Sequence, residues 1–410
     1  MSAITAKASR KMKKYAVLTR EPRCFLGSFD FSWEQRKFEE IAVRSSVICS
    51  DDTLPRVEYE DIVSGTGRLN KDIYAKQSSK SGIVFHQGDV LYGKLRPYLQ
   101  NWLLPTFDGL AVGDFWVLQP QNADSSFLYR LIQSRQFDEV ANQSTGTKMP
   151  RADWKLVSKT VFSIPSNISE QAAIGTYFTA LDSLITLHQR KFEKLTNVKK
   201  SMLEKMFPQN GSSYPEIRFK GFTDPWEQRK LGELVDRVVR KNTNNESTLP
   251  LTISAQYGLV DQITYFNNRV ASRDVSNYYL VLNGEFAYNK STSDGYPFGA
   301  VKRLDLYEKG VLSTLYIVFA PKKEQQIDSD YLTVFFDTDR WHKGVAERAA
   351  EGARNHGLLN ISAEDFFDID LSVPKDIVEQ KQIGAFIRQL DNLITLHQRK
   401  FEKLTNVKKS

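Results

Sequence analysis

Cations, aromatic rings and glycines occur together in two stretches of the first half of the chain. Residues 92–102 read YGKLRPYLQNW, and residues 144–155 read STGTKMPRADWK. Lysine and arginine can neutralise phosphates or donate to guanine, and glycine lets a backbone approach a groove closely. We interpret both stretches as candidate DNA contacts, with a solvated turn as the alternative for each. The candidate residues are Tyr92, Lys94, Arg96, Tyr98, Thr147, Lys148, Arg151 and Lys155.

The second half has two corresponding stretches. Residues 288–299 read YNKSTSDGYPFG, and residues 351–357 read EGARNHG. An asparagine amide can pair with adenine, which adds to the chemistry of the cations. Because both clusters recur at matching places, we favour a DNA-binding role over that of a simple turn. The candidates here are Tyr288, Asn289, Lys290, Ser291, Thr292, Arg354, Asn355 and His356.

No motif in the chain proposes a reaction. The sequence contains no GxxxxGK[ST], no strand-linked GxGxxG with an acidic partner and no HExxH. The Asn/Asp-Pro-Pro-aromatic signature of amino-methylating enzymes is also absent. The glycines of SGTGRLN at residues 64–70 are interpreted as a turn, and the 5 histidines are scattered. We therefore predict no catalytic residue and no metal site in this chain.

An internal repeat organises these clusters. Leu181–Ser201 matches Leu390–Ser410 at 20 of 21 positions and includes LITLHQRKFEKLTNVKKS in both copies. WEQRK begins at Trp33 and again at Trp226, and GDVLYGK in the first half resembles GEFAYNK in the second. Each half thus reads as WEQRK, a globular part and a repeated segment. This is the pattern of a tandem duplication.

The repeated segments are predicted to be long helices. Asn167 with Glu170, and Asp376 with Glu379, have the spacing of capping boxes. A helix of about 39 residues would be about 58 Å long, too long for one small domain to cover. Apolar and polar side chains in 4,3 steps form a seam for helix pairing or partner binding. Its residues are Leu181, Ile185, His188, Phe192, Leu195, Leu390, Ile394, His397, Phe401 and Leu404.

Positions outside this seam are identical as well. Pairing of two helices does not require identical residues at positions such as Gln189, Glu193, Thr196 and Asn197. Two identical partners that dock on the two copies would explain them, and a recent duplication of the DNA is the alternative. His188 and His397 occupy equivalent seam positions, where a polar break can fix the helix register or face a partner.

The globular parts are predicted to be mixed α/β domains. Asp114–Pro120, Leu315–Ala320 and Tyr331–Phe336 are β-rich runs, and short helices are expected at Phe127–Glu139 and Asp330–His342. The two predictions for residues 331–336 overlap. The predicted organisation is a basic tail (1–27), a domain (28–165), a helix (166–207), a linker (208–224), a domain (225–374) and a helix (375–410).

The net charge of +7 does not by itself indicate a nucleic-acid partner. Six cations and no acid lie in residues 1–20, so the rest of the chain is nearly neutral. A disordered tail is our interpretation of this basic segment, and a mitochondrial presequence is the alternative.

No apolar run reaches the roughly 20 residues that span a bilayer. Cys24 and Cys49 lack metal-ligand spacing, which favours a reducing compartment, the cytoplasm.

From about Phe31 onward the chain resembles the specificity subunits of type I restriction–modification systems. The resemblance rests on WEQRK, GDVLYGKLRPYL, STGTKMPRADW, EGARNHGLLNISAEDF and the two capped helices, in that order. It implies an α/β (α+β) fold, a pseudo-twofold tandem of two target-recognition domains, each followed by a long helix. The helices would pair as an antiparallel coiled coil. Each domain would read one half of an asymmetric, bipartite site in double-stranded DNA.

The resemblance also implies partners. Two methyltransferase subunits and restriction (motor) subunits would bind this chain. S-adenosylmethionine, ATP and Mg would belong to those partners, and no cofactor to this chain. The alternative is a stand-alone DNA-binding or architectural coiled-coil protein. Two features depart from the family: RCFLGSFDFS replaces the lead-in YPEIRFKGFTDP before the first WEQRK, and the second helix is shorter by about six residues.

Overall fold

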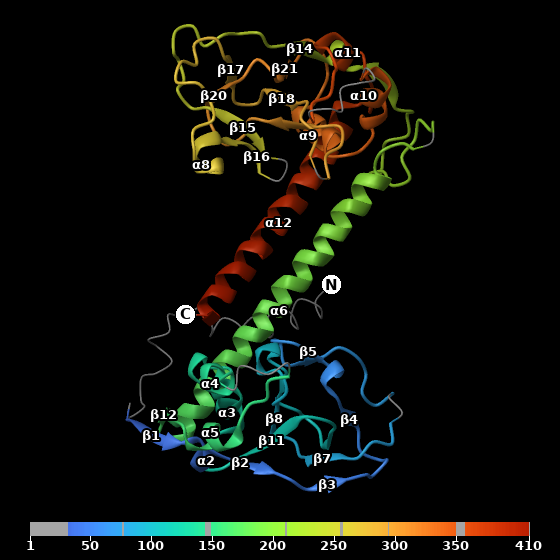
Figure 1. The fold of residues 1–410 in the computed structure, drawn as a ribbon. Helices are drawn as coiled ribbons and strands as arrows, with labels where there is room; N and C mark the ends of the chain where they lie inside the picture. The colour runs from blue at the N-terminus through green and yellow to red at the C-terminus, as the bar shows by residue number, and fades with distance from the viewer. Residues whose placement is uncertain are drawn as a thin grey trace. The chain divides into compact units, whose positions relative to one another are not determined.

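The computed structural model describes residues 32–75, 78–143, 149–209, 211–254, 257–293, 295–349 and 357–409. The chain divides into two compact units (Figure 1). Unit 1 comprises Met1–Ile185 with Leu404–Ser410, and unit 2 comprises Thr186–Lys403. The division falls within the long helices, so the domain limits proposed above stay predictions.

The described residues of unit 1 form two four-stranded sheets and two two-stranded ones. Strand β1 (Trp33–Lys37) pairs antiparallel with β12 (Val161–Pro165), which joins the start of the globular part to its end. The first larger sheet has the order β2 (Ala42–Ser45), β11 (Phe115–Pro120), β8 (Val90–Gly93) and β9 (Trp102–Leu103). The second has the order β3 (Ile48–Cys49), β7 (Gly82–Phe85), β10 (Gly109–Ala111) and β4 (Arg56–Val57).

Short elements complete unit 1. The helices are α2 (Phe38–Ile41), α3 (Ser125–Leu131), α4 (Arg135–Ala141) and α5 (Trp154–Lys159), with 3-10 turns η3 (Tyr59–Asp61) and η4 (Pro97–Leu99) and the pair β5 (Ile62–Val63) and β6 (Arg68–Leu69). Aromatic rings form much of the core between sheet and helices. Tyr92 stacks on Trp116 with 5.6 Å between ring centroids, and its edge meets Phe137 at 5.2 Å. Such ring pairs contribute roughly 1 kcal/mol each beyond their buried area.

Unit 2 repeats this plan with a different sequence. Strand β13 (Glu227–Lys230) pairs antiparallel with β22 (Asp370–Val373). The main sheet has the order β14 (Val235–Arg237), β21 (Ile317–Pro321), β18 (Phe286–Asn289) and β19 (Ala300–Arg303). Two further antiparallel pairs join β15 (Leu251–Ser254) to β16 (Gly258–Asp261) and β17 (Tyr279–Leu282) to β20 (Lys309–Leu312).

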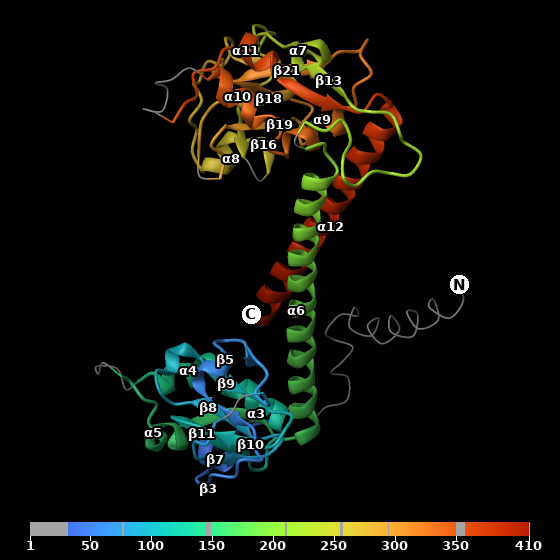
Figure 2. The same ribbon diagram turned by 90° about the vertical axis from the view of Figure 1, so that its right-hand side faces the viewer.

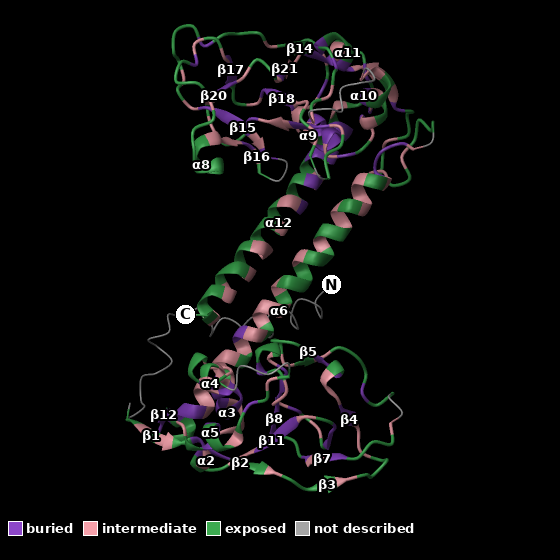
Figure 3. Ribbon diagram, in the orientation of Figure 1, coloured by how far each residue is buried: buried purple, intermediate pink, exposed green. Residues whose placement is uncertain are grey.

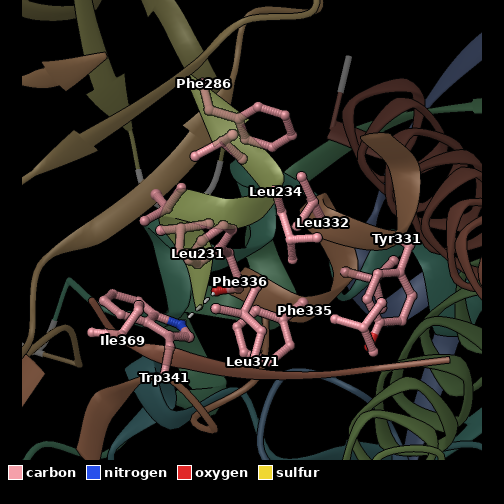
Figure 4. Close-up of a cluster of buried hydrophobic side chains, with 14 of the residues drawn as sticks. Leu231, Leu234, Phe286, Tyr331, Leu332, Phe335, Phe336, Trp341, Ile369 and Leu371 are labelled. Atoms are coloured by element: carbon pink, nitrogen blue, oxygen red, sulfur yellow. Dashed lines mark hydrogen bonds between the residues drawn. The ribbon is translucent and has the colours of Figure 1, made fainter. Parts of the chain in front are cut away.

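Short helices cover the sheet of unit 2. They are α7 (Leu231–Leu234), α8 (Gln262–Phe266), α9 (Ser329–Phe336), α10 (His342–Arg348) and α11 (Ala363–Phe367). Figure 4 shows side chains of α7, α9, β18 and β22, together with Trp341 and Ile369, in one buried cluster. Within it Trp341 donates its indole N–H to the carbonyl of Phe336 at 3.2 Å, so the polar atom of this buried ring is satisfied.

The structure corrects two predictions about local structure. Tyr331–Phe336 is not a strand but most of helix α9, because the Asp328 side chain caps it by accepting from the Tyr331 N–H at 2.9 Å. Each of the two expected short helices is divided in two, into α3 and α4 in unit 1 and α9 and α10 in unit 2. The strands expected near Asp114–Pro120 and Leu315–Ala320 are confirmed as β11 and β21.

The repeated segments form the two long helices α6 (Ile168–Lys205) and α12 (Ile377–Lys409) (Figures 1 and 2). Asn167 accepts from the Ser169 N–H at 2.8 Å, as the predicted N-cap requires. Asp376 accepts from the Val378 N–H at 2.7 Å in the same way. The other half of the predicted capping boxes is wrong. The two glutamates do not point back to the caps but are buried in the globular parts.

The glutamine that follows each glutamate joins its helix to the globular part. Gln171 accepts from the Asp124 N–H, at the N-cap of α3, and donates to the carbonyl of Pro165. Gln380 accepts from the Asp328 N–H, at the N-cap of α9, and donates to the equivalent proline. Each glutamine therefore satisfies a buried donor and a buried acceptor at the same corner of its unit. These bonds explain why a glutamine follows the glutamate at the start of both long helices.

Two contacts join α6 and α12 within unit 2. The Nδ1 atoms of His188 and His397 lie 2.9 Å apart, and the Lys199 ammonium lies 2.8 Å from the Asp391 carboxylate. As residue numbers rise along α6, those of the contacted residues fall along α12, which is the order of an antiparallel pair. The predicted seam residues are buried or partly buried on both helices, whereas much of the remaining surface is exposed (Figure 3).

The same ion pair occurs in unit 1. There the Lys408 ammonium lies 2.7 Å from the carboxylate of Asp182. Lys408 is the repeat copy of Lys199, and Asp182 is the copy of Asp391. The two pairs are thus equivalent contacts, one in each unit. A continuous coiled coil stays a prediction, because each of these contacts lies within one unit.

Within the described residues, no helix is both long and apolar enough to cross a membrane. The same residues contain no group of three or more histidine, cysteine, aspartate or glutamate side chains that could hold a metal ion.

Candidate nucleic-acid interface

The structure brings together the two cation-bearing stretches of the first half. The Ala152 N–H donates to the carbonyl of Lys94 at 2.8 Å, and the Arg96 N–H donates to the carbonyl of Pro150 at 2.7 Å. We call the two segments that hold these four residues the first loop pair. Sequence reasoning found both segments but gave no reason for their contact, since about 55 residues separate them.

In the second half, Gly357, which ends the second stretch, and Leu359 just after it lie beside the first stretch. The Leu359 N–H donates to the carbonyl of Lys290 at 2.9 Å, and the Thr292 N–H donates to the carbonyl of Gly357 at 2.6 Å. We call the segments that hold these residues the second loop pair. Lys94 and Lys290 are equivalent in the GDVLYGK and GEFAYNK motifs, so the same backbone carbonyl joins the loops in both units.

An acidic residue that sequence reasoning missed holds the cations of the first loop pair. Asp114 lies 3.0 Å from the Arg151 guanidinium and 3.4 Å from the Lys94 ammonium. Partial burial works against ionisation of this carboxyl, but Arg151 and Lys94 outweigh it and lower the pKa of Asp114. The carboxylate therefore stays charged and fixes both cations at the edge of the loop pair.

A partly buried tyrosine, also missed, supports the same corner. The Tyr59 hydroxyl donates to the carbonyl of Asp114 at 2.6 Å and accepts from the Leu95 N–H at 2.9 Å. Burial raises the pKa of Tyr59, so the hydroxyl stays protonated and keeps both bonds. The sequence signal for this site is weak, because neither Asp114 nor Tyr59 lies within a motif.

The first loop pair also has an unusual backbone. Arg96 has φ 49° and ψ 66°, and Gln100 has φ 53°, so left-handed residues flank the turn η4 on both sides. Among the described residues the other non-glycine positions with positive φ are asparagines, which tolerate this conformation better than arginine or glutamine. Residues held in this region cluster at functional sites. The turn leaves Tyr98 exposed between the two strained positions.

The second loop pair is built around a close approach of backbone. A Cβ on Gly299 would lie 2.1 Å from the carbonyl oxygen of Asn289, and its φ is 77°, so only glycine fits. The Tyr288 hydroxyl donates to the carbonyl of Phe298 at 2.9 Å. Lys290 donates to the carbonyl of Ile361 at 3.4 Å, which limits how far its ammonium can extend.

Two predicted contact residues are core residues, so for them the prediction is wrong. Tyr92 is 1% exposed and Tyr288 is 0% exposed. Tyr92 stacks on Trp116, and Tyr288 stacks on Phe366 with centroids 4.3 Å apart. Each is the third residue of a four-residue central strand, β8 or β18, whose first three residues are all buried. The aromatic side chain two positions before each lysine therefore belongs to the core.

The other predicted contact residues fall into three groups. Arg96, Tyr98, Arg151, Lys155 and Ser291 are exposed. Lys94, Asn289, Lys290 and Thr292 are partly buried. Thr147, Lys148, Arg354, Asn355 and His356 lie outside the described residues. For all of these residues, contact with DNA stays a prediction.

Comparisons with known proteins show what the chain is similar to. Residues 223–406 match the family model of the type I restriction modification DNA specificity domain. The chain is 25% identical over 192 residues to the EcoDI specificity subunit of Escherichia coli, a match covering 44% of this chain and 43% of the relative. It is 23% identical over 337 residues to the MjaVIII specificity subunit of Methanocaldococcus jannaschii, a match covering 76% of this chain and 77% of the relative.

The fold is also shared with a solved structure. The S subunit of a type I restriction-modification system from M. genitalium superposes with a TM-score of 0.57, covering 93% of this chain and 96% of that one at 13% identity. The tandem, mixed α/β architecture is therefore that of a solved S subunit. The chain is thus similar in sequence to curated type I restriction–modification specificity subunits, and this similarity supports a role in DNA sequence specificity.

Proposed function

We propose that this chain is the non-catalytic DNA-recognition subunit of a type I restriction–modification complex. Each unit would read one half of a bipartite site in double-stranded DNA. The observation that carries this proposal is the loop pair, which is built in both units by equivalent backbone bonds to Lys94 and Lys290. Two domains that bind different half-sites need loops with the same backbone arrangement and different side chains. The two loop pairs have both properties.

The side chains of the two loop pairs support an asymmetric site. The first pair exposes Arg96, Tyr98 and Arg151. The second has Asn289 and Ser291 at its surface, with less charge. Guanidinium groups fork to guanine or phosphate, whereas an amide pairs with adenine. Different bases are thus expected at the two half-sites.

The long helices would hold the enzyme partners. Gln189, Glu193, Thr196 and Asn197 are exposed on α6, and the same residues recur in α12. Identical surfaces are suited to two copies of one methyltransferase subunit, and restriction (motor) subunits would join them. S-adenosylmethionine, ATP and Mg would bind to those subunits, so this chain contributes only recognition.

Co-expression with the methyltransferase subunit encoded beside this chain tests the proposal. We expect native purification to yield two methyltransferase subunits per chain, and the complex to methylate adenines in one asymmetric, interrupted DNA sequence. A chain that stays alone under these conditions and methylates nothing would instead support the stand-alone architectural protein. The joint variant Arg96→Ala and Tyr98→Ala is the matched control, because it should lose methylation yet keep the subunit ratio.

A further inference from the structure

A hairpin turn with no role assigned above lies against the first loop pair. Residues 64–67 (SGTG) connect strand β5 to strand β6. The Gly65 N–H donates to the carbonyl of Gln100 at 3.0 Å, and the Ser64 hydroxyl donates to the side-chain carbonyl of Asn101 at 3.0 Å. The hairpin turn therefore holds the segment that follows η4 in place.

Gln100 has a backbone conformation that glutamine rarely adopts. Its φ is 53° and its ψ is 46°, which is the left-handed region. Its N–H donates to the carbonyl of Pro97 at 2.9 Å, and its carbonyl accepts from Gly65, so the backbone is held on both sides. Glycine or asparagine would adopt this conformation at a lower cost. The two turns thus explain a left-handed residue at this position, but they do not explain a glutamine.

The amide group of the Gln100 side chain has no role in holding the fold together. The residue is partly exposed, and within the described part of the chain its hydrogen bonds are those of its backbone. A Cβ added to Gly65 would lie 3.5 Å from the Gln100 Oε1 atom, so the side chain lies over the hairpin turn and not in the core. Its donor and its acceptor are both available to an external partner.

Gln100 lies next to side chains that are expected to contact DNA. Arg96 flanks the other end of η4, and Tyr98 within this turn is 57% exposed. Strained backbone of this kind clusters at functional sites. An arginine can bind phosphate or guanine, and a primary amide can form two hydrogen bonds with the N6 and N7 edge of adenine. The turn thus presents both kinds of DNA-reading group.

We propose that Gln100 is a specificity-determining residue that reads an adenine in the half-site bound by unit 1. Its amide would donate to N7 and accept from the N6 amino group of that base. Gly65 and η4 position the amide, because they fix the backbone of Gln100 on both sides. This inference rests on the proposed function and extends it to one residue and one kind of base.

Methylation assays on the complex of the full chain with its methyltransferase subunit test this inference. Each base pair of both half-sites is altered in turn, and the rates are compared with the rate on the unaltered site. Gln100→Gly should lower discrimination at one adenine of the first half-site about tenfold or more, the effect of losing a bidentate contact. Discrimination at the other base pairs should stay unchanged. The melting midpoint should not fall, because glycine adopts this backbone without strain.

Gln100→Glu tests the chemistry of the contact. The carboxylate has the size of the amide but cannot donate to N7 of adenine, whereas it can accept from the N4 amino group of cytosine. The relative methylation rates at this one position should therefore shift from adenine toward cytosine.

Asn122→Gly is the matched control for the backbone. Asn122 is exposed, has a φ of 53° and lies outside the loop pairs, so this variant should keep the native sequence preference. Unchanged preferences in both Gln100 variants would overturn the inference. An equal loss at every base pair, which a phosphate contact or a purely structural role would produce, would overturn it as well. A native complex that methylates no DNA would instead refute the proposed function, and this inference with it.

Discussion

At the scale of single residues, charged and polar side chains determine how the loops and helices are held. Asp114 fixes two cations of the first loop pair, and a histidine pair joins the long helices in unit 2. Burial lowers the pKa of both His188 and His397, and the nearby Lys191 and Lys400 lower it further. Each ring is thus kept neutral in the folded chain, where a hydrogen bond between the two Nδ1 atoms needs one of them unprotonated.

The histidine pair predicts a pH dependence of stability. A histidine whose folded pKa lies below the ordinary 6.5 favours folding above pH 6.5, and this stability is lost as pH falls toward the folded pKa, because the unfolded chain takes up protons first. The melting midpoint should therefore fall between about pH 7 and pH 5. The joint variant His188→Gln and His397→Gln should show a shallower fall.

Two other histidines calibrate this experiment. Burial also lowers the pKa of His342, so some pH dependence should remain in the double variant. The exposed His86→Gln is the control and should follow the native profile. An unchanged slope in the double variant would show that the helix pair does not titrate in this range.

The exposed cation of the first loop pair predicts a selective effect on DNA binding. Replacing Arg151 together with Lys148 by alanine should weaken binding about tenfold or more at the half-site read by residues 30–165, because a base- or phosphate-contacting charge is lost. Binding measurements with one half-site altered at a time would separate the two contributions. Arg135→Ala, which removes an exposed cation of unit 1 paired with Glu139, should leave both unaffected, and equal losses at both half-sites would refute the assignment.

At the scale of elements, local pattern predicted the long helices better than the short ones. The 4,3 periodicity and the caps at Asn167 and Asp376 are local signals, so α6 and α12 begin within a few residues of their predicted starts. Tyr331–Phe336 is rich in residues that favour strands, yet five of the eight residues of α9 are buried in the core cluster, and that burial prevails over propensity. Asp328 is a typical N-cap residue and could have indicated this helix, but the strand propensity of the residues after it favoured the wrong prediction.

The start of each long helix lies directly against the globular part. In unit 2 a Cβ on Gly384 would lie 2.7 Å from the Asp330 Cβ and 3.0 Å from its carbonyl carbon. Gly384→Ala should therefore lower the free energy of unfolding of unit 2 by about 1–3 kcal/mol, although alanine is the better helix former. Chemical denaturation measures this loss. Ala385→Leu, at the exposed neighbouring position, should change it by less than about 0.5 kcal/mol.

At the scale of the whole molecule, the sequence predicted the duplication but not the contacts within the two loop pairs. The matching segments Leu181–Ser201 and Leu390–Ser410 and the two WEQRK motifs identified two halves. The contacts between Lys94 and Ala152, and between Lys290 and Leu359, depend on the path of the chain through two different sheets, which no local pattern contains. The burial of the Tyr92 and Tyr288 side chains could not be predicted for the same reason. Tertiary packing, and not the local sequence, determines which face of a strand lies against the core.

The length of the long helices is expected to set the unread spacer between the half-sites. Inserting one identical heptad into both Leu181–Ser201 and Leu390–Ser410 adds about 10 Å of helix, or about three base pairs of DNA. The methylated sequence of the complex should then keep both half-sites and lengthen only its spacer. A seven-residue insertion in the exposed turn at Thr243–Asn245 is the control, and an unchanged spacer in an active heptad variant would contradict this ruler.

The contact between His188 and His397 has a consequence for symmetry. Each residue is the copy of the other, and a residue can meet its own copy only on a twofold axis, so the local axis of the helix pair passes between the two imidazoles. One neutral ring must donate its Nδ1 proton while the other accepts. The two copies of LITLHQRKFEKLTNVKKS therefore hold different histidine tautomers, although their residues are identical.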